Sequence, residues 1–280
     1  MKQNLRPVYY DVPELTPEEQ QMPLARFFKE YPMPRPNPLQ QQLLDAGPMD
    51  PKDAVPAENW LDILQPTGYR KIEFGYCMMP DGSGYYAEYY LSPPVIRPGM
   101  RPWYMKWMNH KSKSMVPGQG NLRYKLWMHL DHWDHAFVNG VDGSDGVWAK
   151  GSLDLGKSRV YEEEISHNVN LRDFGLTEER EKELKDAGCN WMAGYEDVPG
   201  GHHLVLRLNR PCPFGGMETI AHEWIGYYAK DGKIIRDENT PCSEEYLKNV
   251  LTHNTVEHAY TQIFLPPLWE AYHDQPEDAD

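Results

Sequence analysis

The stretch at residues 124–135, YKLWMHLDHWDH, alternates between apolar and polar positions in the way that predicts a β-strand. Its even-numbered positions from Tyr124 onward share one mainly apolar face, and that face ends at His132. The other face carries most of the charges and His129, which we therefore expect to point away. A histidine on an apolar face is costly unless a metal ion, a substrate or a backbone carbonyl pairs with its ring nitrogens.

Further strands are predicted after residue 70. The segments KIEFGYCM and YYAEYYL, joined by the turn PDGSG, predict a hairpin, and CNWMAGYE, HHLVLRLNR and METIAHEWIGYYAKDGKIIR predict later strands. In SRVYEEEISH, Tyr161, Glu163 and Ile165 share one parity. We therefore expect Glu163 to point inward, although an acidic exposed strand is the alternative.

Helical spacing predicts three clear helices. One covers RPWYMKWMNH, and a second is capped by Thr177 and runs to about Ala187. The longest is capped by Ser243 and ends at Pro266, with a single inward stripe along its length. Many antiparallel strands followed by a long helix predict an α+β fold in which a curved sheet grips that helix around a cavity.

Residues 1–66 are rich in proline and glutamine and predict only short helices. Asn37 caps one of them, with Pro38 at its first position and Gly47 past its end, and a second short turn covers residues 57–64. We expect an irregular N-terminal helical segment over 1–66, with a flexible arm as the alternative, and a main domain over 67–280.

Composition narrows the classes of partner. The formal net charge of −14 argues against nucleic acid and anionic membranes, and no apolar run approaches a membrane span or a signal peptide. The four cysteines form no CxxC pair, so neither a disulfide framework nor a thiolate zinc site is predicted. We expect a cytoplasmic protein whose ligand is a small molecule.

His253 and Glu257 lie four positions apart on the long helix, so both side chains project into the same space. The His-x-x-x-Glu pattern is common by itself. Added to it, His132 and Glu163 supply a second imidazole and a second carboxylate. Together the four residues make a complete set of ligands for zinc.

Other histidines are candidates for substrate contact. His135 follows the predicted strand closely enough to reach a bound substrate. In HHLVLRL, the parity of the leucines places His202 inward and His203 outward, while His222 shares a face with two large apolar residues. Each is more often a packed or surface histidine than a catalytic one.

This ordered set resembles the 2,4-diacetylphloroglucinol hydrolase and phloretin hydrolase family. The resemblance rests on Tyr124 in RYKLW, the DH at 131–132, His135, Glu163 and the final His253-x-x-x-Glu257, and it extends over roughly residues 70–264. The family has a Bet v 1-like, helix-grip domain behind a small helical N-terminal part, so this fold and a homodimer are what the resemblance implies.

The resemblance also implies an activity, the hydrolysis of the carbon–carbon bond between a polyhydroxylated ring and an acyl group, giving a phenol and a carboxylic acid. It implies zinc held by His132, Glu163, His253 and Glu257, and substrate bound by Tyr124 and by the residue at 135. A further catalytic histidine falls at His202 or His203, and spacing does not choose between them. The alternatives are a non-catalytic carrier of a flat ligand and another metal enzyme, a cyclase or decarboxylase, acting on phenolic polyketides.

Overall fold

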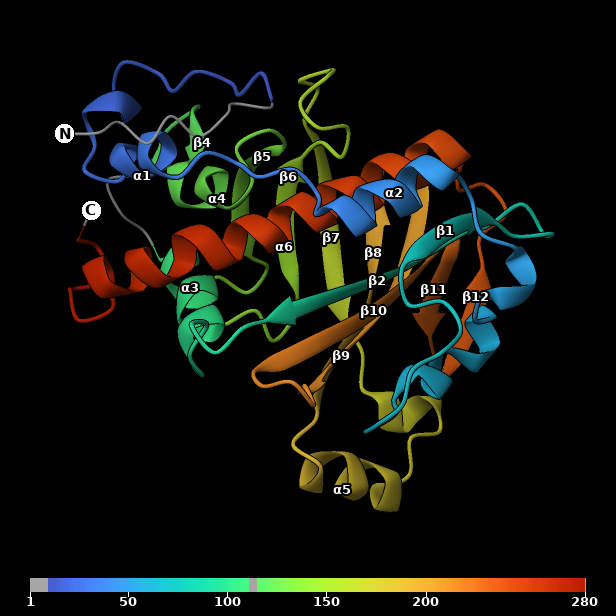
Figure 1. Cartoon of the computed structure of the whole chain (residues 1–280). Helices are drawn as coiled ribbons and strands as arrows, with labels where there is room; N and C mark the ends of the chain where they lie inside the picture. The colour runs from blue at the N-terminus through green and yellow to red at the C-terminus, as the bar shows by residue number, and fades with distance from the viewer. Residues whose placement is uncertain (1–9, 111–114, 280) are drawn as a thin grey trace.

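The computed structural model describes residues 10–110 and 115–279. Its frame is an eight-stranded antiparallel sheet in the order β1-β2-β10-β9-β8-β7-β6-β5 (Figure 1). Two small hairpins, β3–β4 and β11–β12, form separate two-stranded sheets. The strands are β1 (Gly75–Met78), β2 (Gly84–Ser92), β3 (Met115–Val116), β4 (Gly120–Asn121), β5 (His132–Phe137), β6 (Val147–Gly151), β7 (Glu162–Asn168), β8 (Asn190–Val198), β9 (Gly201–Pro211), β10 (Met217–Ile225), β11 (Tyr227–Lys230) and β12 (Lys233–Arg236).

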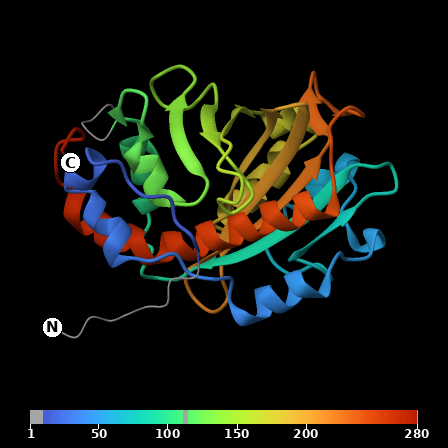
Figure 2. The same cartoon turned by 90° about the horizontal axis from the view of Figure 1, so that it is seen from above.

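The long helix α6 (Glu244–Tyr272) crosses one face of this sheet, as Figures 1 and 2 show. The predicted cap is confirmed, because the Ser243 hydroxyl accepts a hydrogen bond from the Tyr246 amide at 3.1 Å. The prediction that Pro266 ends the helix is wrong, since α6 continues through it. A proline removes one helical hydrogen bond, but the turns beyond it bury Leu268 and most of Tyr272 in the core.

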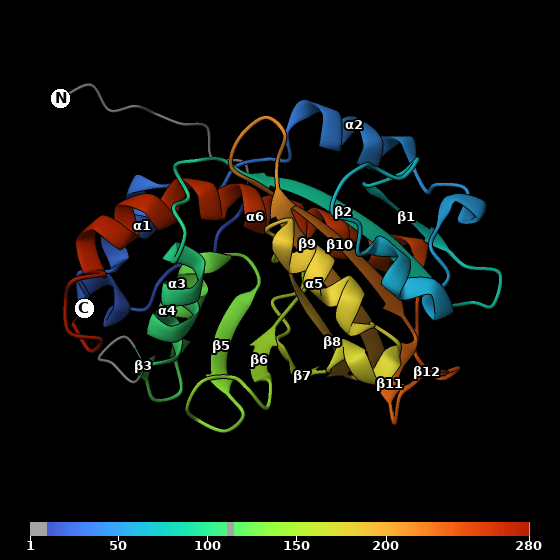
Figure 3. The same cartoon turned by 90° about the horizontal axis from the view of Figure 1, so that it is seen from below.

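The opposite face of the sheet is covered as well. Leu204, Leu206 and Leu208 of β9 belong to a buried cluster with Trp60 of the 3-10 helix η3 (Ala57–Ile63) and Leu184 of α5 (Glu178–Asp186). Figure 3 shows α5 on this side of the strands. The leucines therefore face the short helices, and the alternate residues of β9 face α6.

The stretch at residues 124–135 is only partly a strand. Residues Leu122–Trp127 form the helix α4, and β5 begins at His132, so the strand predicted from Tyr124 is wrong over its first part. The Asn121 side chain caps α4 by accepting from the amides of Arg123 and Tyr124. Apolar and basic residues of α4 are both buried. The alternation of apolar and polar residues in this part of the sequence therefore does not correspond to a buried and an exposed face of a strand.

The N-terminal region consists of short helices, as predicted. Asn37 and Gln40 form a capping box at the start of α2, and Gly47 follows its end. Leu24 and Phe27 pack into the core cluster to which α6 contributes. The helices of this region are η1 (Glu19–Gln21), α1 (Ala25–Glu30), α2 (Pro38–Ala46), η2 (Pro51–Asp53) and η3.

Two helices lie between strands at their predicted positions, α3 (Met100–Asn109) and α5, whose Thr177 cap is present; η4 (Leu171–Phe174) precedes α5. The α+β class is confirmed, with the eight-stranded sheet packed against α6. The Bet v 1-like assignment and the division at residues 66 and 67 stay predictions. All four cysteines are free, in agreement with the absence of a predicted disulfide framework.

Candidate metal centre and substrate cavity

A cavity of about 1100 Å³ lies between the sheet and α6. Its size is in the range of sites that enclose a small organic ligand. Both aromatic and ionisable side chains line it, which suits a ligand that is flat and carries polar groups. Its lining includes Tyr86, Tyr124, Trp127, His132, His135, Phe137, Glu164, Glu196, His203, Arg207, Glu223, Tyr246, His253 and Glu257.

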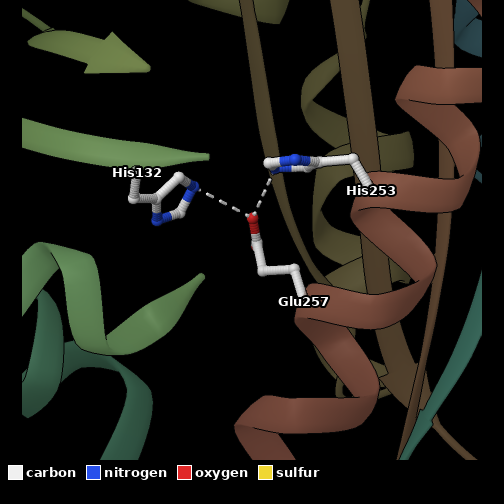
Figure 4. Close-up of side chains that lie close together, drawn as sticks. All are labelled: His132, His253 and Glu257. Atoms are coloured by element: carbon white, nitrogen blue, oxygen red, sulfur yellow. Dashed lines mark ion pairs between the residues drawn. The ribbon is translucent and has the colours of Figure 1, made fainter. Parts of the chain in front are cut away.

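At one place in this lining, two imidazoles converge on one carboxylate. The Nε2 atoms of His132 and His253 lie 3.4 and 3.3 Å from the same oxygen, Oε2 of Glu257 (Figure 4). All three residues are buried, and their potential ligand atoms lie within 4.8 Å of one another. His132 begins β5, while the other two occupy successive turns of α6, so the sheet edge and the helix build the cluster together.

Each of the two rings is fixed through its other nitrogen. His253 Nδ1 lies 2.6 Å from Oδ2 of Asp131, and His132 Nδ1 lies 3.3 Å from the backbone carbonyl of Tyr124. Asp131 is itself fully buried and accepts hydrogen bonds from the Ser152 hydroxyl and the Gly156 amide. Histidines that bind metals through Nε2 commonly donate their Nδ1–H to a carboxylate or a carbonyl in this way.

The charges within the cluster support one another. Burial by itself would lower the pKa of His253, but Asp131 and Glu257 raise it to about 10. Burial would raise the pKa of Glu257, yet its hydrogen bonds to His132 and His253 hold it well below the ordinary value. For His132 burial dominates and lowers the pKa. A carboxylate thus stays ionised inside a low-dielectric cavity, which is the state a cation requires.

These residues fit a divalent metal such as zinc. Two imidazole nitrogens and one carboxylate oxygen are typical protein ligands for a catalytic zinc ion, which keeps a further position open. Because the pKa of His253 is raised, zinc would displace a proton from this ring when it binds. In such sites each ligating histidine is usually oriented by a partner on its second ring nitrogen, and both rings here have such a partner at Nδ1. Three of the four predicted ligands, His132, His253 and Glu257, are therefore brought together by the structure.

Glu163 does not join them. Its side chain is 61% exposed, and its carboxylate accepts from the Trp148 indole and pairs with Lys150. The neighbouring Glu164 also borders the cavity but is half-buried, and burial raises its pKa while His253 lowers it. The expectation that Glu163 points inward is wrong by one residue, because the face of β7 that carries Tyr161 and Ile165 is not the cavity face.

The predicted substrate-contacting residues of the 124–135 stretch do lie in the cavity. The rings of Tyr124 and His132 are stacked, with centroids 3.9 Å apart and planes 6° from parallel. His135 approaches the Tyr124 ring, with centroids 4.8 Å apart, and its Nδ1 lies 2.8 Å from the side-chain oxygen of Asn109. Burial lowers the pKa of His135 to about 3 and raises that of Tyr124 well above its usual value. In this state the imidazole is neutral and the phenol is protonated.

The two adjacent histidines of β9 are separated by the sheet. His203 is buried in the cavity lining, where its Nε2 lies 3.4 Å from the Tyr246 hydroxyl and burial lowers its pKa to about 4. His202 instead pairs with Asp237 at 2.7 Å and stacks on Tyr228, outside this cavity. The parity that predicted His202 inward is wrong, because the leucine face of β9 meets the short helices and not α6.

A second polar group lies beside His203. The side chains of Glu196 and Glu223 come within 4.8 Å of it and of each other, and Arg207 pairs with Glu223 at 3.2 Å. Burial raises the pKa of both glutamates, and neighbouring carboxylates add to the effect. One wall of the cavity therefore offers a dense set of hydrogen-bonding groups.

Two further histidines lie outside the cavity lining. The ring of His129 is buried, stacks on Phe28 and meets the Tyr260 hydroxyl at 3.0 Å, so it does not reach the cavity, although the polar strand face on which it was predicted does not exist. His222 lies on the leucine side of the sheet, with its Nδ1 2.6 Å from the Tyr85 hydroxyl.

Sequence reasoning missed Asp131 and Glu164. Asp131 was placed on the polar face of a strand that the structure does not contain, although its position next to His132 was visible. Glu164 was not selected because parity with Tyr161 and Ile165 favoured Glu163, and the structure shows that this face of β7 is the exposed one.

The fold and the site define an α+β protein with a buried His₂–carboxylate cluster at the wall of an aromatic cavity. Residues 55–270 match the family model described as the DAPG hydrolase PhiG domain, where DAPG abbreviates 2,4-diacetylphloroglucinol. The chain belongs to this family. No individual curated protein matches it. In the described part of the chain, no helix combines the length and apolar character needed to cross a membrane.

Proposed function

We propose that this protein is a zinc-dependent hydrolase that cleaves the carbon–carbon bond between a polyhydroxylated aromatic ring and its acyl group. The observation that carries the proposal is the convergence of His132, His253 and Glu257 inside an aromatic-lined cavity of a chain that belongs to the DAPG hydrolase family. Acylphloroglucinols and phloretin-type aryl ketones are the substrate class. The products are a phenol and a carboxylic acid.

Zinc would be held by His132, His253 and Glu257, and we propose Glu164 as the additional carboxylate. Its support is its place in the cavity lining and its electrostatic interaction with His253 and Glu257. When bound, zinc supplies a Lewis acid next to the acyl group of the substrate. We retain no ligand role for Glu163, whose carboxylate is exposed and paired with Lys150.

The cavity residues would form hydrogen bonds with the substrate's oxygen atoms and assist the proton transfers of the reaction. Overall, water adds its oxygen to the acyl carbon, the bond to the ring breaks, and the ring carbon takes up a proton. Tyr124 stays protonated because of its burial, so its hydroxyl can donate a hydrogen bond to a substrate oxygen. His135 and His203 stay neutral, so each can accept a hydrogen bond from a ring hydroxyl.

The cavity also positions the ring. Aromatic side chains on its wall, Tyr124 and Trp127 among them, offer flat apolar surface to a phenol. A bound ring would displace water from this wall, which strengthens the hydrogen bonds that the lining groups make. A carrier would need only the apolar surface, whereas the oriented histidines and the buried carboxylate favour catalysis.

The test is incubation of the purified chain with phloretin, monoacetylphloroglucinol and 2,4-diacetylphloroglucinol, with products identified by mass spectrometry. Zinc is measured in parallel by elemental analysis. We expect about one bound zinc per chain and release of a phenol together with the matching carboxylic acid. Intact substrates in the presence of bound zinc would contradict the hydrolase proposal and favour another metal enzyme, while absence of zinc would favour a carrier. The proposed homodimer is measured separately by analytical ultracentrifugation.

A further inference from the structure

The residue after Glu257 on α6 makes a second buried contact between a histidine and a carboxylate. His258 Nδ1 lies 2.7 Å from Oε1 of Glu88, and the two side chains are only 3% and 1% exposed. The other nitrogen of the ring, Nε2, lies 3.8 Å from Oε1 of Glu257. His258 therefore stands between a carboxylate of β2 and the carboxylate of the proposed metal site.

The two oxygens of Glu257 have different neighbours. Oε2 is the atom on which His132 and His253 converge, whereas Oε1 faces His258. A carboxylate that is held at one oxygen can still rotate about its last bond. A ring edge fixed 3.8 Å from the second oxygen restricts that rotation and directs the first oxygen toward the two imidazoles.

The His258 ring is held from two directions. Glu88 holds its Nδ1 edge, and the ring of Tyr90 lies flat against it, with centroids 3.8 Å apart and planes 14° from parallel. Glu88 and Tyr90 are two positions apart on β2, so both project from one face of the strand toward α6. With both contacts on one rigid strand, the Nε2 edge of His258 has a fixed direction.

Glu88 is poorly explained as a purely structural residue. Its Oε2 atom is buried and has no hydrogen-bond partner among residues 10–110 and 115–279. A buried carboxylate with an unused oxygen destabilises a fold, and natural proteins keep such groups mainly where function requires them. A similar carboxylate–histidine contact lies nearby, since a carboxylate oxygen of Asp131 contacts Nδ1 of His253 as one of Glu88 contacts Nδ1 of His258.

We infer that Glu88 and His258 are positioning residues, which act through Glu257 to hold the metal in the cavity. The inference rests on the proposed function, because it needs a metal at this cluster. It assigns to β2 a role in metal affinity although β2 contributes none of the proposed ligands. Outer partners of this kind typically change metal affinity by about 10- to 100-fold.

The test measures zinc affinity by competition with a chelator, and records the visible absorption of the cobalt-substituted protein. We expect His258→Phe and Glu88→Leu to weaken zinc binding by about 10- to 100-fold and to alter the cobalt bands. Glu88→Gln keeps an acceptor for His258 Nδ1 and should retain most of the affinity. If His258→Phe does not fold, the Leu and Gln variants of Glu88 make the same comparison from the strand side.

The matched control is His222→Phe, which replaces an equally buried histidine on the other face of the sheet. It should lower the melting temperature without changing zinc affinity or the cobalt spectrum. Wild-type affinity and an unchanged spectrum in both His258→Phe and Glu88→Leu would overturn this inference alone, provided that His253→Ala loses the metal. A wild-type chain that binds no zinc would overturn the inference and the metal part of the proposed function together.

Discussion

Asp131 and His253 are 122 positions apart in the sequence, yet a carboxylate oxygen of the first lies 2.6 Å from Nδ1 of the second. The contact fixes which nitrogen of His253 faces Glu257. We predict that Asp131→Asn lowers zinc affinity by about 10- to 100-fold, because an amide can present its NH₂ group to Nδ1 and favour the wrong tautomer. Chelator competition measures the effect. Unchanged affinity would mean that Glu257 alone orients the ring.

Tyr124 contributes its ring and its hydroxyl to different tasks. The ring stacks on His132, while the hydroxyl is the group proposed to meet the substrate. Tyr124→Phe should keep the stacking and therefore the bound zinc, but lower kcat by about 100- to 1000-fold, the usual effect of losing a transition-state hydrogen-bond donor. Zinc content and steady-state kinetics on one preparation separate the two tasks. Loss of zinc in this variant would show that the hydroxyl supports the metal site.

Glu163 and Glu164 provide a matched pair of neighbours on β7. Both border the cavity, but the Glu163 side chain is 61% exposed whereas Glu164 is half-buried. We predict that Glu163→Gln leaves zinc content and activity close to wild type, whereas Glu164→Gln lowers both. Elemental analysis and product formation measure the outcome. The opposite ranking would mean that β7 shifts its register by one residue when metal binds.

His202 and His203 form a second pair, because they are adjacent in sequence and lie on opposite faces of β9. His203→Gln should reduce kcat/KM by about 100-fold, in the range of lost acid–base contributions, since only this ring reaches the cavity. His202→Gln should leave kcat/KM unchanged, but the loss of its hydrogen bond with Asp237 should lower the melting temperature. A thermal melt of both variants therefore accompanies the kinetics. Equal losses of activity in the two variants would contradict the assignment of His203 to the substrate.

We predict that the free energy of unfolding of the metal-free protein depends on pH because of the buried His129. Burial, and then the neighbouring His132, lower its pKa to about 3, compared with 6.5 in an unfolded chain. As the pH falls from 6.5 toward 3, the unfolded chain binds a proton that the folded chain does not bind. The free energy of unfolding therefore decreases in this window, by up to about 1.4 kcal/mol per pH unit for one proton, and the contribution is complete above pH 6.5.

The corresponding variant is His129→Gln, whose amide can still meet the Tyr260 hydroxyl. Denaturant melts between pH 4 and pH 7 should show a shallower slope than wild type by about one proton equivalent. His135 and His203 have low pKa values too, so the variant should keep part of the dependence. Identical slopes in both proteins would show that His129 does not carry the effect.

The parts of the fold that follow from local signals were predictable from sequence. The caps at Asn37, Thr177 and Ser243 mark helix starts that depend on one side chain and the next few amides. The i, i+4 spacing of His253 and Glu257 needed only a helix to bring the two side chains together. These predictions did not depend on the tertiary packing of the elements.

The wrong predictions concern which face of a strand points toward the cavity. Both faces of the sheet are covered, so apolar parity in β9 identified the leucine face but could not say that it meets η3 and α5 rather than α6. At β7 the cause is different, because the face that carries the apolar Ile165 is exposed to solvent, and parity with this residue selected Glu163 in place of Glu164. In residues 122–127 nearly every side chain is buried, and an alternation of apolar and basic residues then fits a buried helix as well as a strand.

The cap at Ser243 has a consequence for the whole site. It fixes the residue at which α6 starts to turn, and each residue of an α-helix advances the side-chain direction by about 100°. His253, Glu257 and His258 meet Asp131, His132 and Glu88 only because the count of residues from the cap is right. A single insertion or deletion between Ser243 and His253 would rotate every one of these groups away from its partner, so the length of this segment is as much a part of the active centre as the residues it carries.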